Sequence, residues 1–149
     1  MNGMEWKVTK YEELGRDELY NILSLRAEVF VVEQDCVYQD VDGKDHKAVH
    51  ISGYEGDLLV AYCRIFPSGE YFENTAVGRV AVRKEYRAKG YGHSLMQLAL
   101  GEIYTIWGAG PVTISAQLYL EKFYNSHGFE RIGSVYQEDG IDHIRMVRI

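Results

Sequence analysis

The chain has 149 residues, a hydrophobic fraction of 46% and a formal net charge of −6. A chain of this length buries roughly two thirds of its unfolded surface in one core, so we expect a single domain over residues 1–149. The acidic balance argues against nucleic acid as a partner. The longest apolar run, Leu58 to Cys63, is far too short to span a membrane, and the first ten residues lack the apolar core of a signal peptide.

These features predict a cytoplasmic protein that binds neither a membrane nor nucleic acid. The two cysteines, Cys36 and Cys63, form no Cys-x-x-Cys pair and are too few for a disulfide scaffold. We expect both to be reduced thiols.

The first half of the chain predicts one helix among several strands. A strand is expected over Glu5 to Lys10, a helix over Asp17 to Val32, and further strands over Ala48 to Tyr54 and Leu58 to Phe66. The turn Glu55-Gly56-Asp57 joins the last two strands into a predicted hairpin.

The stretch Gly78 to Leu95 predicts a strand that runs through a basic, glycine-bearing loop directly into a helix. Val80, Ala81 and Val82 form an apolar run typical of a buried strand, which we expect to extend from Thr75 to Arg83. Apolar residues then recur at three- and four-residue intervals, so a helix with one apolar stripe begins at Gly92 or His93. Its stripe consists of Leu95, Leu98, Ala99, Ile103 and Ile106.

The loop between this strand and helix is suited to an anion. Arg87 and Lys89 supply positive charge, while Gly90 and Gly92 leave the backbone uncovered and can adopt positive φ. The free amides at a helix start attract phosphate groups. A dinucleotide fingerprint does not fit, because Leu95 occupies the place of its third glycine, and no Gly-Lys-Ser or Gly-Lys-Thr of a triphosphatase loop occurs in the chain.

The remaining pattern, RAKGYG at residues 87–92, resembles the pyrophosphate loop of the GCN5-related N-acetyltransferases (GNAT), which bind acetyl-coenzyme A (acetyl-CoA). The order of the following elements is also similar to that family: a strand over Val112 to Gln117, a helix over Leu118 to His127, and a turn into another strand. Tyr124, Gly128 and Phe129 match the family's Y-x-x-x-G-F element.

Other segments resemble the ElaA-like branch of the family, so that the resemblance extends from Leu25 to Met146. Two positions depart from it: Ala88, where relatives often carry glycine or a larger polar residue, and Asp142, where proline is expected. The segments are LRAEVFVVEQ, DVDGKD, His50, the pair Ala116-Gln117 and EDGIDH.

The resemblance implies an α/β fold with one mixed sheet, whose central strands splay apart where the strand ending at Arg83 stops pairing with the strand from Val112. A cofactor would lie in that gap. It also implies transfer of the acetyl group of acetyl-CoA to a primary amine by direct attack in a ternary complex.

The same resemblance assigns roles to residues of the cofactor site. Backbone amides of Val80, Ala81 and Val82 would polarise the thioester carbonyl. Tyr124 would be the general acid, because a phenol with a pKa of about 10 keeps its proton at neutral pH. Gln117 is a further cofactor contact, and the pyrophosphate would be held by the segment Arg87, Ala88, Lys89, Gly90, Tyr91, Gly92, His93 and Ser94.

The acceptor side is less determined by the sequence. Phe30, Glu33 and His50 are candidate substrate contacts, but Glu33 could instead pair with Arg26 on the same helical face. His50 and His143 lie among strand residues and could each be structural, so the general base is not assigned.

The acidic turn Asp40-x-Asp42-Gly43-x-Asp45 has its glycine at the wrong position for a calcium loop, and no metal is expected. Its charges suggest that it attracts a cationic amine.

Two other functions remain open at this level. A non-catalytic sensor of CoA or acyl-CoA would use the same loop, and a structural α/β module could bind any phosphate there. The acceptor could be a small-molecule amine or an amine of a peptide or protein, and the oligomeric state is open, a homodimer included.

Overall fold

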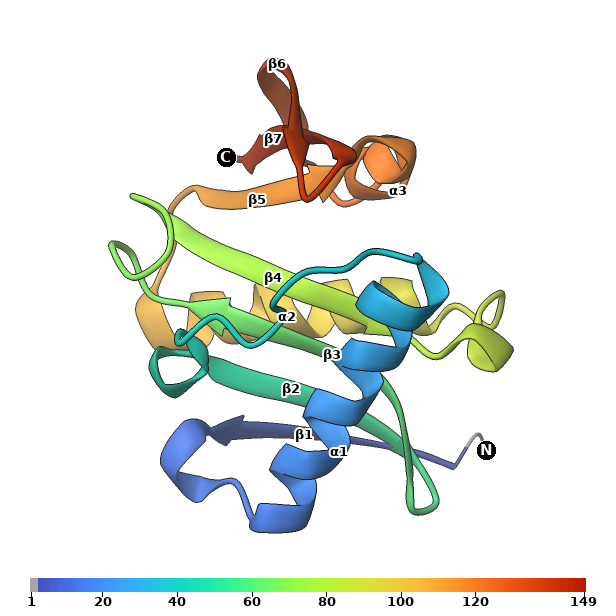
Figure 1. Cartoon of the computed structure of the whole chain (residues 1–149). Helices are drawn as coiled ribbons and strands as arrows, with labels where there is room; N and C mark the ends of the chain where they lie inside the picture. Colours follow the sequence, from blue (N-terminus) through green and yellow to red (C-terminus); the bar gives the residue numbers. More distant parts are fainter. Residues whose placement is uncertain (1–2) are drawn as a thin grey trace.

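The computed structural model describes residues 3–149, which form one seven-stranded mixed sheet in the order β1-β2-β3-β4-β5-β7-β6 (Figure 1). β4 and β5 are parallel, and every other neighbouring pair is antiparallel. This arrangement confirms the mixed α/β class expected from the sequence. The strands are β1 (Met4–Lys10), β2 (Val49–Glu55), β3 (Leu58–Phe66), β4 (Thr75–Val82), β5 (Val112–Gln117), β6 (Glu130–Glu138) and β7 (Ile141–Arg148).

Helices cover both faces of the sheet (Figure 1). α1 (Arg16–Arg26) lies on one face, α2 (Tyr91–Trp107) lies on the other, and the short α3 (Glu121–Asn125) follows β5. β3 is buried between α1 and α2, which explains why its sequence is almost continuously apolar. Its Tyr62 belongs to the core cluster that includes Leu25 of α1, whereas its Cys63 belongs to the cluster that includes Leu95 of α2.

Three helix boundaries differ from the sequence-based expectation. The helix predicted over Asp17 to Val32 is α-helical only to Arg26 and continues as a wider π-helical segment, Ala27–Glu33. Apolar spacing does not distinguish the two, because a single wider turn adds only one residue to the repeat. The segment predicted as helix over Leu118 to His127 is a 3₁₀ turn followed by α3, and α2 begins at Tyr91.

The hairpin of β2 and β3 is confirmed. Glu55 pairs with Leu58 across a two-residue loop, in which Gly56 has a φ of +61°. Such a loop needs positive φ to match the twist of its strands, and glycine adopts it without a steric penalty.

The sheet divides between β4 and β5, as the family resemblance implied. Only two residue pairs join these strands, Thr75 with Val112 and Ala76 with Thr113, and beyond them the strands diverge. On its other side β4 carries a bulge: Gly78 pairs with Arg64 and Ala81 pairs with Tyr62, which leaves two residues of β4 opposite one of β3. Arg79 in this bulge has a φ of +52°.

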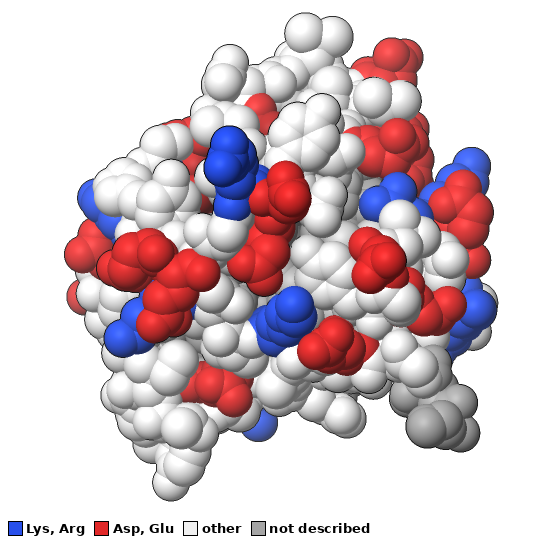
Figure 2. Space-filling model, turned by 90° about the horizontal axis from the view of Figure 1, so that it is seen from below, with Lys and Arg blue, Asp and Glu red and all other residues white. Residues whose placement is uncertain are grey.

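None of the helices that the structure describes has both the length and the apolar character needed to cross a bilayer. The face of the molecule seen from below carries acidic side chains between which the basic ones are dispersed, without a continuous basic area (Figure 2).

Candidate functional site

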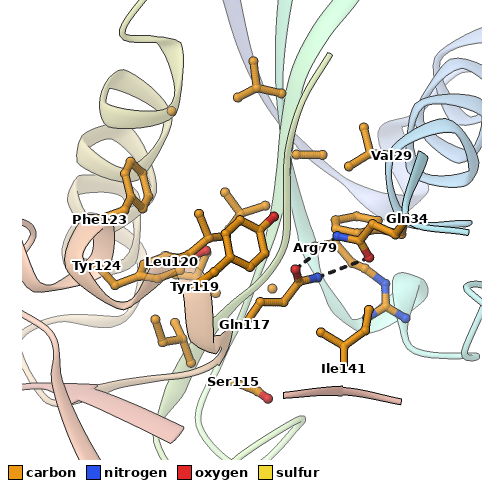
Figure 3. Close-up of a pocket in the computed structure, with 18 of the residues that line it drawn as sticks. Val29, Gln34, Arg79, Ser115, Gln117, Tyr119, Leu120, Phe123, Tyr124 and Ile141 are labelled. Carbon is orange, nitrogen blue, oxygen red and sulfur yellow. Dashed lines mark hydrogen bonds between the residues drawn. The ribbon is translucent and has the colours of Figure 1, made fainter. Parts of the chain in front are cut away.

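A cavity of about 480 Å³ lies where β4 and β5 diverge (Figure 3). The π-helical segment, β4, the loop before α2, β5, α3 and the β6–β7 hairpin all contribute to its wall. Most of the residues singled out from the sequence line it: Phe30, Val80, Ala81, Val82, Arg87, Ala88, Gly90, Tyr91, Gly92, His93, Gln117 and Tyr124.

One end of the cavity is formed by the start of α2. Gly90 precedes the helix with a φ of +81°, and the first intrahelical bond runs from the amide of Ser94 to the carbonyl of Gly90 at 3.1 Å. Within residues 3–149, the amides from Ala88 to His93 donate to no protein acceptor. These free donors, together with the positive end of the helix dipole, form a site that fits the two phosphates of a CoA diphosphate.

Ala88 also adopts positive φ, +68°, although it has a side chain. The left-handed conformation costs a non-glycine residue roughly 1–2 kcal/mol, so the loop holds this residue against its own preference. Successive amides in such a conformation point into one concave space, which is the geometry of an anion-binding nest.

The two ends of the predicted amide segment are not free. The amide of Arg87 donates to the carbonyl of Lys84 at 3.3 Å, and the amide of Ser94 closes the first turn of α2. The side chains of Lys89 and Ser94 do not line the cavity: the Lys89 ammonium lies 5.0 Å from the centre of the Tyr86 ring, and the Ser94 hydroxyl donates to Gly90. Of the backbone amides expected to bind the pyrophosphate, those from Ala88 to His93 are therefore the ones free to do so.

The end of β4 exposes backbone groups to the gap. The amide of Arg83 donates to the carbonyl of Val60 at 2.7 Å and therefore faces β3. Backbone groups alternate in direction along a strand, so those of Val82 face away from β3. The Val82 carbonyl accepts a hydrogen bond from Arg87 Nε at 2.9 Å, which leaves the Val82 amide in the cavity wall.

Tyr124 forms another part of the wall. Its ring contacts Phe123 and Phe129 edge-on, with centroids 5.0 Å and 6.1 Å away, and its side chain is almost completely buried. Its hydroxyl has no hydrogen-bond partner among the residues that the structure describes. Burial raises the pKa of this phenol, so it keeps its proton at neutral pH and can donate it into the cavity.

The turn after α3 fixes this tyrosine. Gly128 has a φ of +89°, and the amide of Phe129 returns to the carbonyl of Tyr124 at 3.2 Å. This is a glycine-capped helix end, and it places the fully buried Phe129 against the tyrosine ring.

A pair of glutamines spans the cavity farther along β5. Gln34 Nε2 donates to Gln117 Oε1 at 3.1 Å, and Gln117 Nε2 donates to Gln34 Oε1 at 3.3 Å (Figure 3). The pair links the end of the π-helical segment to the end of β5. The sequence did not predict a role for Gln34, because its partner Gln117 is 83 positions away.

Of the three residues expected to contact the acceptor, Phe30 lines the cavity, but His50 and Glu33 do not. His50 is fully buried and does not line the cavity; its Nδ1 lies 2.6 Å from the Tyr62 hydroxyl and its Nε2 lies 2.9 Å from the Asp45 carbonyl. Burial lowers the pKa of His50, as expected for a structural imidazole. Glu33 also lies outside the cavity wall, and it pairs with Arg87 instead of Arg26.

Arg26 belongs to a buried network with the acidic turn. Its Nε lies 2.8 Å from Asp40 Oδ2 and its Nη1 lies 2.7 Å from Asp45 Oδ1. Arg64, also fully buried, binds Asp45 at 2.7 Å and Asp42 at 2.5 Å. The expectation that these three carboxylates attract a cationic acceptor is therefore wrong, because buried arginines already neutralise them.

The residues at the hairpin end of the cavity had no site role assigned to them from the sequence. Glu138, Asp139 and His143 line it there, together with Tyr38 and Tyr71. The two-residue turn of the β6–β7 hairpin pairs Glu138 with Ile141, and Tyr136 with His143. The spacing of Glu138 and His143 around Asp139-Gly140 was the available signal, because it puts both side chains on one face of a hairpin.

A mixed sheet that divides between two parallel strands, with free amides at the start of the following helix, defines the acyltransferase class of fold. A family model described as "Acetyltransferase (GNAT) domain" matches residues 10–149, and the chain belongs to this family. It is 44% identical to Protein ElaA of Escherichia coli strain K12 over 147 residues, which cover 97% of this chain and 96% of that protein.

Solved structures agree with the family assignment. The crystal structure of Escherichia coli ElaA has a TM-score of 0.92 at 42% identity and covers 98% of this chain and 99% of its own. An acyl-CoA N-acyltransferase from Pseudomonas aeruginosa has a TM-score of 0.93 at 38% identity, with the same coverage of both chains. The resemblance to GNAT proteins and to the ElaA-like branch is thus confirmed.

Proposed function

We propose that this protein is an N-acetyltransferase that transfers the acetyl group of acetyl-CoA to a primary amine of a small molecule, peptide or protein. The acceptor amine attacks the thioester directly while both substrates are bound. One observation carries the proposal: a single cavity has free helix-start amides at one end and an unpartnered, protonated phenol, Tyr124, in its wall.

The donor substrate would be held along this cavity. Amides from Ala88 to His93 bind the diphosphate, and each hydrogen bond to a charged group contributes about 1.5–3 kcal/mol. The Val82 amide faces the gap and stabilises the oxygen of the thioester carbonyl as it becomes negatively charged. Tyr124 donates its proton to the departing sulfur.

The relatives support acyl transfer, since the similar Pseudomonas aeruginosa protein is an acyl-CoA N-acyltransferase. We place the reaction in the cytoplasm, where thiols such as those of Cys36 and Cys63 stay reduced. The description of the family as acetyltransferases supports acetyl as the acyl group that is transferred.

Calorimetry with the purified protein tests donor binding. Acetyl-CoA should bind much more tightly than ADP, and inorganic phosphate should bind weakly if at all, because the cavity extends from the anion end toward Tyr124. Equal affinity for acetyl-CoA and ADP would favour a general phosphate-binding module.

A panel of amines tests transfer. The protein is incubated with acetyl-CoA and alkylamines, diamines, amino acids or a short peptide, while release of free CoA thiol is followed. Acetylation of at least one primary amine, verified by mass spectrometry, is expected. Tight binding of acetyl-CoA with no turnover on any amine would favour a non-catalytic acyl-CoA sensor.

A further inference from the structure

A polar cluster at the hairpin end of the cavity has no role in the donor binding proposed above. Ser115 on β5, Glu138 on β6 and His143 on β7 line the cavity there, and Tyr136 on β6 contacts Ser115 and His143. The register pairs Tyr136 with His143 and Gln117 with His143, so the side chains of these strands that lie at two-residue intervals share one face of the sheet. The β6–β7 hairpin and β5 thus bring these groups together.

The hydrogen bonds of His143 determine which nitrogen carries its proton. His143 Nδ1 lies 2.8 Å from the carbonyl oxygen of Ile141, and a carbonyl can only accept, so Nδ1 is the donor. In the neutral imidazole, Nε2 then has a free lone pair. Nε2 lies 3.8 Å from Glu138 Oε2, a carboxylate that would stabilise the imidazolium formed when Nε2 takes up a proton.

The rest of the cluster holds these two groups in place. The Ser115 hydroxyl donates to Glu138 Oε1 at 3.1 Å and also shares a short hydrogen bond with the Tyr136 hydroxyl. The Tyr136 ring stacks on His143, with ring centroids 6.0 Å apart and an interplanar angle of 28°. The His143 side chain is 8% exposed, so it can present only one edge to the cavity.

Two carboxylates and two guanidinium groups lie around the cluster. Asp139 lines the cavity beside Glu138, and Glu138 is close enough to Tyr71 to contribute, after burial, to the raised pKa of that phenol. Arg145 lies two residues after His143 on the same strand, but its guanidinium stacks on the Phe72 ring at 4.5 Å. Arg79, the other nearby cation, is held 2.8 Å from Asp40.

We propose that this cluster is the acceptor subsite, that His143 is the general base of the reaction, and that Glu138 positions His143 and stabilises its charged form. The proposal rests on the function proposed above. The subsite would take an alkylammonium group that has no carboxylate beside it, because Glu138 and Asp139 would repel one. Diamines and unmodified alkylamines fit this description better than free amino acids do.

The proton movements balance in this arrangement. An alkylammonium with a pKa of about 10.4 gives one proton to His143 Nε2, which later releases it to solvent. The neutral amine forms a bond to the acetyl carbon while the carbon–sulfur bond breaks. Tyr124 gives its proton to the sulfur and regains one from the nitrogen, which becomes the neutral amide, so that the products are the acetylated amine, free CoA and one proton.

Two probe amines distinguish a base from a structural histidine. A His143→Gln variant should lower kcat/KM for n-butylamine about 100-fold or more, the usual contribution of a general base, and leave the Kd of acetyl-CoA unchanged. Methoxyamine is uncharged at neutral pH and needs no first deprotonation, so the variant should lose only a few-fold with it. His46→Gln, at an exposed histidine, is the matched control and should change neither rate.

Equal loss with both amines would overturn the assignment of His143 as base. A wild-type protein that acetylates neither probe amine but acetylates another amine of the panel would overturn the alkylammonium subsite and leave the proposed function standing, whereas no turnover on any amine would overturn both. A measurement without turnover tests the geometry separately. ¹⁵N spectra of the imidazoles should show His143 protonated on Nδ1 in the neutral form. A neutral form protonated on Nε2 would contradict the proposal whatever the activity.

Discussion

The carboxylate of Glu33 binds both terminal nitrogens of Arg87, at 2.5 Å and 2.8 Å. The two residues are 54 positions apart, and their pairing joins the last residue of the π-helical segment to the loop before α2. The hydrogen bonds from Arg87 lower the pKa of Glu33. In this state the arginine nearest the free amides is already neutralised, so a bound diphosphate must compete with Glu33 for it.

We expect a Glu33→Gln variant to bind acetyl-CoA two- to fivefold more tightly, because removing the carboxylate releases Arg87 and removes a negative charge beside the site. The gain in affinity is limited to this range because a partly exposed ion pair such as Glu33–Arg87 contributes at most about 1 kcal/mol of free energy. Calorimetry measures the change, and Glu28→Gln, on the exposed side of the same segment, is the control. Weaker binding by Glu33→Gln would show that Glu33 instead preorganises Arg87 for the phosphate.

A Tyr124→Phe variant should lose turnover by about 100-fold or more while it keeps its affinity for acetyl-CoA. The phenyl ring preserves the contacts with Phe123 and Phe129, so the fold and the cavity wall are unchanged. Steady-state rates and calorimetry together separate the two effects. Tyr104→Phe, at an exposed position of α2, should leave both quantities as in the wild type, and an active Tyr124→Phe would exclude the phenol as the acid.

Gly92 and Gly101 are both in α2, and they offer a matched pair of substitutions. A Cβ at Gly92 would meet the Phe123 ring at 3.4 Å, an ordinary contact, and a Cβ at Gly101 would meet nothing within 4 Å. Alanine should stabilise the helix at either position by up to about 1 kcal/mol.

Only Gly92→Ala should weaken binding of acetyl-CoA, because Gly92 belongs to the free-amide turn that lines the cavity. We expect at least a tenfold rise in Kd for Gly92→Ala and none for Gly101→Ala, with thermal unfolding reporting that both remain folded. Unchanged affinity in Gly92→Ala would mean that the phosphates lie away from this part of the helix start.

The buried arginine–aspartate network predicts the response of stability to acid. Burial alone would raise the pKa of Asp45, but the hydrogen bonds and charges of Arg26 and Arg64 lower it overall. A lowered folded-state pKa means that this stabilisation is complete above the unfolded value of about 3.9 and is lost as the pH falls through the lower folded value. His50, whose pKa burial lowers, has the same sign and acts from about pH 6.5 downward.

Urea unfolding at a series of pH values should therefore show stability that decreases slightly below about pH 6.5 and steeply below about pH 4. Asp45→Asn should cost about 3–5 kcal/mol at pH 7, since it leaves two buried guanidinium groups without this partner, and the dependence below pH 4 should become shallower. A variant that keeps wild-type stability but has a raised KM for the amine would restore the turn as an acceptor site.

Local features of the sequence were sufficient to predict the strand, loop and helix start that carry the free amides. Glycine at position 90 is required where the backbone turns to positive φ. The same holds for Gly128, which ends the helical turn after Tyr124. Helical spacing correctly placed Leu95, Leu98, Ala99 and Ile103 of α2 against the core, whereas Ile106 of the expected stripe is 43% exposed. The limits of α1 were missed, because a change from α to π geometry leaves the apolar pattern almost intact.

Which residues form the hairpin end of the cavity depended on contacts between distant segments. Nothing near His50 or His143 in the sequence tells which one faces a cavity; His50 is covered by Tyr62 and the Asp45 backbone, whereas His143 emerges beside the divergence of β4 and β5. Likewise, Glu33 forms its ion pair with Arg87, 54 residues away in the sequence, and not with Arg26, seven residues before it.

The amino-acid sequence by itself determined the local backbone that prepares an anion site, because residue type controls which φ values and helix starts are accessible. Only the tertiary structure decided which side chains share the cavity, since strand register and the splitting of the sheet bring together residues that local patterns treat independently. The fold accordingly neutralised the acidic turn with buried arginines and placed Glu138 and His143 in the cavity wall.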